Sequence, residues 1–460
     1  MAVESSTQLS LVPCRKRSRI EEDVDDLNLI NINELPEALL LEILYRLPCQ
    51  WALQCKSVSK RWYSLISDPY FIRSFIHHRH CHKFGEFSEP FTLLLMHKDN
   101  IIHLPSDNSE LSLDCGRDGF DFLNFLPCIK RARKSIEAAF NDLLLVCSEV
   151  PPTRNISGFC EYYICNPFTK EWLMLPSPPY MSMGRTAAMV SFICEKYYCY
   201  DIDLQECITN VNYRYKVVCW IRSPSEPITS ELKMEIFSSE TGEWSSLVVS
   251  SRWGFEPLPH GVACNGMLHW VNADTRHNKG LVVFDPFNEN AELRYIDLPF
   301  EFTKHSFSIG EFQGRLRIFQ FLFTLSREAL FFSVWELEDY GNNGTWCMKH
   351  KVYLNQMISE HVMLVEIAEK SSRQIEFLAF HPKDGELVFL QFRNYVVLCN
   401  MRKMELKEAG QLRDRSEILE QFLPAPSGRF FLLYEPPIQT CIPTWATIMA
   451  NTNCSTPIEV

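Results

Sequence analysis

The sequence lacks the features that mark several large classes of protein. In 460 residues, no apolar run approaches the roughly 18 residues that span a bilayer, and the N-terminus lacks the apolar segment of a signal peptide. A basic surplus is also missing: the formal net charge is −12, which argues against a general nucleic-acid binder. We therefore expect a protein of the cytoplasm or nucleus that binds neither membrane nor nucleic acid.

Motifs of familiar chemistry are missing too. The sequence has no Gly-x-Gly-x-x-Gly, phosphate loop, Gly-x-Ser-x-Gly or His-Glu-x-x-His, and its 18 cysteines form no Cys-x-x-Cys pair. Without an export signal, these cysteines are expected to be reduced thiols. The densest group of potential metal ligands is too crowded for a tetrahedral site: His77, His78, His80, Cys81 and His82. We predict no catalytic residue, no metal and no cofactor.

What is present suits a globular protein of more than one domain. Apolar residues make up 46% of the chain and charged residues 22%, and the length allows two or three domains. Residues 1–31 are polar, with a basic cluster at 15–19 and an acidic run at 21–26, which predicts a disordered tail. The basic cluster is either a solvated part of that tail or a nuclear import signal. We expect a flexible C-terminus over residues 446–460.

Residues 32–80 read as two or three short helices. The first carries apolar residues at helical spacing, namely Leu35, Leu39, Leu40, Ile43, Leu44 and Leu47. Pro36 suits its first turn, and Pro48 stops it. A later helix has Val58, Trp62, Leu65 and Ile66 at the same spacing and ends at Asp68-Pro69. A unit this small buries little surface alone, so it is expected to leave apolar surface for a partner. The alternative is that the stripe is only the internal seam of a helical hairpin.

From residue 84 to about 445 the chain reads as all β. Short β-rich runs alternate with turn signals at Asn265-Gly266, Asn343-Gly344 and Asp384-Gly385. The runs most typical of strands are Phe91–Met96, Asp142–Cys147, Tyr162–Cys165, Tyr213–Ile221, Leu281–Phe284, Leu316–Phe323, Phe331–Trp335 and Leu387–Phe392.

Weak internal repeats indicate a β-propeller. A Thr-x-Glu-Trp element at 169–172 returns at 241–244, and a glycine-turn unit at 261–270 returns at 310–319. Repeats of roughly 45–50 residues are typical of propeller blades, in which four strands bury their faces only against neighbouring blades. The sequence predicts about six to eight blades. The long interval between the two Thr-x-Glu-Trp elements predicts an insertion.

The helical segment resembles an F-box. Leu35-Pro36, Ile43-Leu44, Arg46-Leu47-Pro48, Val58, Lys60-Arg61-Trp62 and Leu65-Ile66 fall where that family has them. The resemblance implies a Skp-type adaptor as partner and, through it, cullin and RING subunits of a ubiquitin ligase. It implies adaptor contacts at Leu35, Pro36, Ile43, Leu44, Leu47, Val58 and Trp62.

The β region resembles the plant F-box-associated, kelch-like domain. The resemblance rests on the unit at 261–270, on Phe284-Asp-Pro-Phe with the later Ile296-Asp-Leu-Pro, and on the unit from Val334-Trp to Trp346. The chain departs from strict kelch repeats, because no Gly-Gly pair occurs in it. The expected fold class is α+β multidomain: a small helical F-box followed by an all-β, propeller-like domain.

Taken together, these patterns favour a non-catalytic substrate receptor of an SCF-type ubiquitin ligase. The F-box would bind the adaptor, and the β domain would bind a target protein whose identity the sequence does not give. Two alternatives are an adaptor-independent β-propeller scaffold and a carbohydrate-active propeller. The segments Glu195–Asn210 and Arg222–Ser230 are long enough to reach a ligand, but any loop on the rim of a propeller could do so.

Overall fold

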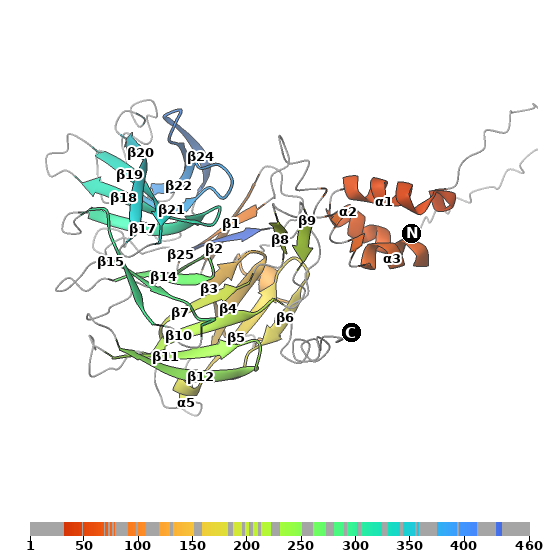
Figure 1. The fold of residues 1–460 in the computed structure, drawn as a ribbon, viewed down its shortest axis with the longest axis horizontal. Helices are drawn as coiled ribbons and strands as arrows, with labels where there is room; N and C mark the ends of the chain where they lie inside the picture. The colour runs from red at the N-terminus through yellow and green to blue at the C-terminus, as the bar shows by residue number, and fades with distance from the viewer. Residues whose placement is uncertain are drawn as a thin grey trace, which may run out of the picture.

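The computed structural model describes two bodies, a helical unit and a β-propeller (Figure 1). The described residues are 32–47, 49–68, 70–71, 74–75, 78, 91–97, 100–106, 119–128, 132–150, 159–182, 187–195, 198–201, 206–209, 213–221, 231–250, 261–272, 280–288, 292–300, 305–323, 330–340, 344–354, 357, 375–392, 395–411 and 429–434. The predicted tails at 1–31 and 446–460 lie outside these ranges, as do His77, His80, Cys81 and His82.

Three α-helices of the helical unit have both ends among the described residues, where the sequence predicts two or three. They are α1 (Glu37–Arg46), α2 (Cys49–Gln54) and α3 (Lys60–Ser67), with 3-10 turns η1 (Ile32–Glu34) and η2 (Cys55–Ser57). The sequence predicts Pro36 in the first turn of α1. In the structure it is the N-cap, one residue before the helix begins. The hydroxyl of Ser59 caps α3 by accepting a hydrogen bond from the Trp62 N–H. No helix among the described residues is long and apolar enough to cross a membrane.

The β domain is a six-bladed propeller, at the lower end of the predicted range. Five blades have four described antiparallel strands each and one has three. The first four-stranded blade consists of β3 (Arg133–Phe140), β4 (Leu143–Val150), β5 (Phe159–Asn166) and β6 (Glu171–Met174). The second consists of β7 (Ala187–Cys194), β10 (Tyr215–Ile221), β11 (Glu231–Ser238) and β12 (Glu243–Ser250). Between them lies the short helix α5 (Pro179–Ser182), and before them the turn η3 (Asp121–Leu123).

The remaining blades complete the circle. Three are four-stranded: β13 (Val262–Cys264), β14 (Met267–Val271), β15 (Gly280–Phe284) and β16 (Arg294–Asp297); β17 (His305–Phe312), β18 (Arg315–Phe323), β19 (Leu330–Asp339) and β20 (Thr345–Tyr353); and β21 (Ile375–Phe380), β22 (Leu387–Phe392), β23 (Tyr395–Asn400) and β24 (Glu405–Gln411). The sixth joins the two ends of the domain, with β25 (Arg429–Tyr434) paired to β1 (Phe91–His97) and β1 to β2 (Asn100–Pro105).

Apolar packing between blades closes this ring. Each of the six junctions between neighbouring blades has its own cluster of buried side chains. The largest fully buried residues of the propeller, including Trp270, Tyr163 and Phe332, belong to these clusters. A single blade cannot bury both of its faces, so the blades are stable only as a closed circle.

The predicted repeats occupy equivalent places in the blades. The units at 261–270 and 310–319 are the hairpins between the first two strands of their blades. Their two-residue turns, Asn265-Gly266 and Gln313-Gly314, have positive φ at both positions, the type I′ geometry that glycine and asparagine favour. The Thr-x-Glu-Trp elements are the turns from β5 to β6 and from β11 to β12, between the third and fourth strands.

The predicted insertion is a separate hairpin. Strands β8 (Tyr198–Asp201) and β9 (Glu206–Thr209) pair only with each other among the described strands, and they lie between β7 and β10. In three other blades, the first two strands are joined by a two-residue turn. The hairpin is therefore an addition that the propeller itself does not require.

Tryptophans of the repeat join neighbouring blades. The indole N–H of Trp244 on β12 donates to the Pro176 carbonyl after β6, and that of Trp346 on β20 donates to Asp297 on β16, each at 2.8 Å. Trp172 holds the equivalent place on β6, but the preceding blade has only three described strands, and this side chain is 43% exposed.

This difference gives a stability prediction. Trp244→Phe keeps an aromatic ring but removes the donor, so we expect it to lower the free energy of unfolding by about 1 kcal/mol. Trp172→Phe is the matched control and should change it by less than about 0.5 kcal/mol. Urea unfolding followed by fluorescence measures both, and equal effects would contradict the interblade role of Trp244.

Candidate functional site: an apolar stripe on the helical unit

Helix α1 divides its apolar residues between two faces. Leu40 and Leu44 are fully buried, whereas Leu39 is 52% and Ile43 39% exposed. Residues four apart lie one turn apart on the same face, so Leu39 and Ile43 form one continuous outward surface, which we call the outer stripe. Leu35 and Leu47 flank it and are half-buried.

The inner face of α1 supplies the core of the helical unit. Leu40 and Leu44 pack with Ala52, Trp62, Ile66, Phe71 and Phe75 in a single buried cluster. The alternative of an internal seam is thus correct for Leu40 and Leu44, and the outer stripe is apolar surface beyond that seam. This unit has more apolar side chains than its own core buries.

The seven residues predicted to contact an adaptor are placed differently from one another. Pro36, Ile43 and Val58 are exposed, Val58 by 55%; Leu35 and Leu47 are half-buried; Leu44 and Trp62 are buried inside the unit. The two buried residues shape the surface from beneath and offer little area themselves. The adaptor contact of all seven stays a prediction.

The predicted contacts leave out several exposed apolar or aromatic residues of this unit, among them Leu39 and Trp51. Leu39 belongs to the predicted apolar pattern but not to the predicted contacts, and Trp51 on α2 is 57% exposed. The signal for Leu39 was present in its spacing, four residues after Leu35 and four before Ile43. Trp51 had no comparable signal, because α2 is only six residues long.

The propeller has two unlike faces. At one face the first strand of each blade meets the second; β7 ends there at Cys194, opposite Tyr215 at the start of β10. The chain enters β1 at the same face, where Phe91 pairs with Tyr434 of β25, the innermost strand of its blade. The β8–β9 hairpin therefore emerges from the face at which the chain enters β1. Residues 222–230 lie outside the described ranges, but the strand ends that they join, Ile221 and Glu231, are at the opposite face.

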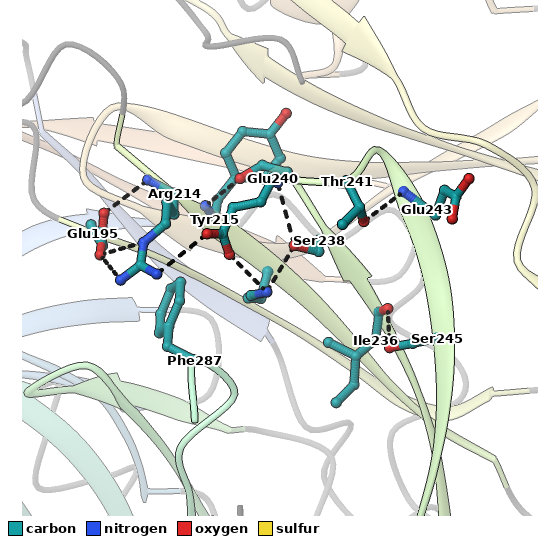
Figure 2. A network of polar contacts seen from close by, with 12 residues as sticks. Glu195, Arg214, Tyr215, Ile236, Ser238, Glu240, Thr241, Glu243, Ser245 and Phe287 are labelled. Atoms are coloured by element: carbon teal, nitrogen blue, oxygen red, sulfur yellow. Dashed lines mark hydrogen bonds and ion pairs between the residues drawn. The ribbon is translucent and has the colours of Figure 1, made fainter. Parts of the chain in front are cut away.

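A polar network fixes the base of the β8–β9 hairpin (Figure 2). The Nε of Arg214 donates to Glu195 Oε1 at 2.8 Å, and the Arg214 backbone N–H donates to Oε2 of the same carboxylate at 3.0 Å. Glu240, in the turn after β11, accepts from Arg214 and from Lys216. The hydrogen bonds that the Arg214 guanidinium donates to the Glu195 carboxylate raise the pKa of Arg214. The guanidinium also lies 5.3 Å from the ring centroid of Phe287, which belongs to the next blade.

The described residues offer neither a cluster of metal ligands nor, at Cys194 and Cys399, an ionised thiol. No group of three or more His, Cys, Asp or Glu side chains that could hold a metal occurs among the described residues. Burial raises the pKa of the Cys399 thiol to about 12 and raises that of Cys194 as well, so both stay protonated at neutral pH. Thiols in that state are poor nucleophiles.

A buried histidine gives the fold a dependence on pH. His269 on β14 is fully buried, and burial lowers its pKa from 6.5 to about 4. Because the folded state resists protonation, the stability that this neutral ring contributes is complete above about pH 6.5 and is lost as the pH falls toward 4. The shift corresponds to about 3 kcal/mol. We expect the thermal unfolding midpoint to decrease as the pH is lowered from 7 to 5, and to decrease less steeply in His269→Gln. An equal dependence of the midpoint on pH in the two proteins would contradict the assignment to His269.

Comparison with known proteins assigns both bodies. A family profile described as "F-box protein At3g26010-like, beta-propeller" matches residues 125–423. The chain belongs to this family of F-box proteins. A second profile, "F-box-like", matches residues 32–78 and so covers the helical unit with its outer stripe.

Relatives of this F-box protein align over most of its length. F-box protein At5g49610 of Arabidopsis thaliana is 26% identical over 83% of this chain and 93% of its own. F-box protein At3g26010 of the same plant is 25% identical over 82% of this chain and 79% of its own. The putative F-box/kelch-repeat protein At1g15680 is 23% identical over 71% and 74%. The expected combination of a helical F-box and a β-propeller is confirmed.

Proposed function

We propose that this F-box protein is the substrate-receptor subunit of an SCF-type ubiquitin ligase. The observation that carries the proposal is the outer stripe, where Leu39 and Ile43 present apolar surface that the helical core leaves uncovered. A Skp-type adaptor would cover that surface and link the chain to cullin and RING subunits. Exposed apolar patches of this kind in a small unit are typical of protein interfaces.

In this role the chain performs no bond chemistry itself. The propeller would hold a target protein so that a target lysine lies near the ubiquitin-conjugating enzyme, which raises the effective concentration of the two reactants. The polar network at the base of β8–β9 would help to present one face of the propeller as a rigid surface. We further infer that the propeller is of the kelch-like kind, supported by the relatives that carry this name.

Co-expression with a Skp-type adaptor tests the proposal. The two chains should elute together in size-exclusion chromatography as a complex of one copy each. Leu35→Ala/Pro36→Ala should weaken the complex while leaving the circular dichroism spectrum of the chain unchanged. An unmodified chain that elutes alone would favour the adaptor-independent scaffold instead.

A further inference from the structure

Arg61 joins two parts of the predicted adaptor surface. Leu35 and Pro36 precede α1, whereas Val58 ends the turn η2 and Trp62 lies in the first turn of α3. The Nη2 of Arg61 donates a hydrogen bond to the backbone carbonyl of Leu35 at 2.9 Å, across 26 residues of sequence. This contact ties the beginning of α3 to the residues that lead into α1.

The start of α1 has no side-chain cap of its own. Pro36 occupies the N-cap position and makes no capping hydrogen bond, so the helix begins without the usual local anchor. The carbonyl of Pro36 accepts hydrogen bonds from the N–H groups of Leu39 and Leu40. The bond from Arg61 to the adjacent Leu35 carbonyl therefore holds the turn from which the outer stripe begins.

Arg61 is an unfavourable residue for its own helix. With Lys60 it places two positive charges in the first turn of α3, at the positive end of the helix dipole, and no acidic residue lies in that turn. Residues that break a local rule are usually compensated elsewhere. The compensation here is the hydrogen bond to Leu35.

We propose that Arg61 is a positioning residue for the adaptor interface: it fixes Leu35-Pro36 and the outer stripe relative to Val58, which ends η2 just before α3. This inference rests on the proposed function. Arg61 acts through the geometry of the helical unit rather than through its charge. Substitution of Arg61 would leave the apolar residues of the surface unchanged, but it would remove the hydrogen bond that orders them. The partner would then have to order these residues on binding.

The test measures the affinity of the full chain for a purified Skp-type adaptor by calorimetry at several salt concentrations. Arg61→Gln should weaken binding roughly tenfold, because a charged hydrogen bond is lost, and Arg61→Lys should restore part of it. Arg46→Gln is the matched control: it removes the same charge from the same unit, but among the described residues Arg46 pairs only with Glu42 of its own helix, at 2.7 Å. We expect less than about a twofold effect for that variant.

Salt dependence separates positioning from direct charge contact. A positioning role predicts that Arg61→Gln keeps the wild-type salt slope, whereas a charge that touches the partner predicts a flatter slope. A wild-type affinity for Arg61→Gln, an equal loss in Arg46→Gln, or a flattened slope would each overturn the inference.

Amide exchange separates this inference from the proposed function. If the unmodified chain fails to bind the adaptor, the proposed function fails, yet exchange at Leu39 and Leu40 still reports on Arg61. These amides should exchange faster in Arg61→Gln than in Arg46→Gln. Equal exchange in the two variants would show that Arg61 does not fix the start of α1.

Discussion

Leu39→Asp/Ile43→Asp should abolish binding of a Skp-type adaptor, with a loss of affinity of at least about a hundredfold. Burial of each apolar side chain stabilises an interface by roughly 1.5–3 kcal/mol, and two buried, unpaired carboxylates add a further penalty. Both positions are exposed in the free chain, so the variant should remain folded. Calorimetric titration of the adaptor into the full chain measures the effect.

Val248→Asp is the matched control for this loss. Val248 is 54% exposed but lies on β12 of the propeller, away from the helical unit in the chain. We expect adaptor affinity within about twofold of the unmodified chain, because a surface substitution outside the interface has little effect. Retained binding by the double variant, with the control unchanged, would mean that the outer stripe is not the adaptor surface.

The second large effect concerns stability: Arg317→Leu should lower the free energy of unfolding by about 3 kcal/mol. Arg317 on β18 and Glu336 on β19 are 7% and 6% exposed and form an ion pair at 2.7 Å. Removal of one partner leaves a buried, uncompensated charge, which typically costs about 3–5 kcal/mol. Arg315 and Lys349 also approach Glu336, at 3.4 and 3.7 Å, so the lower end of that range is expected.

Arg317 also joins two blades. Its Nη1 donates to the Gly385 carbonyl of the following blade at 3.2 Å, and its guanidinium lies 4.0 Å from the ring centroid of Phe312. Urea unfolding measures the loss, and the double variant Arg317→Met/Glu336→Leu serves as control because it leaves no buried unpaired charge; Arg315 and Lys349, which also lose Glu336, are 57% and 31% exposed. The double variant should be more stable than Arg317→Leu; the opposite order would contradict the charge argument.

Much of the propeller was predictable because its signals are local. Leu387–Phe392 was predicted as a strand and is β22 with the same ends, and Asn265-Gly266 was predicted as a turn because both residues tolerate positive φ. The long interval between the two Thr-x-Glu-Trp elements correctly indicated an insertion. The strand and the turn depend on residues that are close in sequence, and each Thr-x-Glu-Trp element is itself a short motif.

Long-range contacts set the limit of prediction. The pairing of β25 with β1 joins the two ends of the domain, and no local pattern indicates which strand closes a ring. The hydrogen bonds between Glu195 and Arg214 span an inserted hairpin. The segments Glu195–Asn210 and Arg222–Ser230 look equally suited to ligand binding in sequence. The strand ends that these segments join lie at opposite faces of the propeller, which follows from the registers of β7, β10 and β11.

The two faces of α1 illustrate the same limit on a smaller scale. Leu39 and Leu40 are adjacent, as are Ile43 and Leu44, and both pairs fit one amphipathic pattern. Which member faces inward depends on Trp62, Phe71 and Phe75, which pack against Leu40 and Leu44 from later in the chain. The sequence therefore predicted an apolar stripe wider than the surface left open.

The most direct test of the account is side-chain footprinting of the full chain with and without a Skp-type adaptor. The account predicts that labelling of Leu39 and Ile43 falls sharply in the complex. Trp172 and Val248, which are exposed on the propeller, should be labelled equally in both states and so serve as internal controls. Unchanged labelling of Leu39 and Ile43 in a complex that forms would contradict the claim that the adaptor covers this stripe.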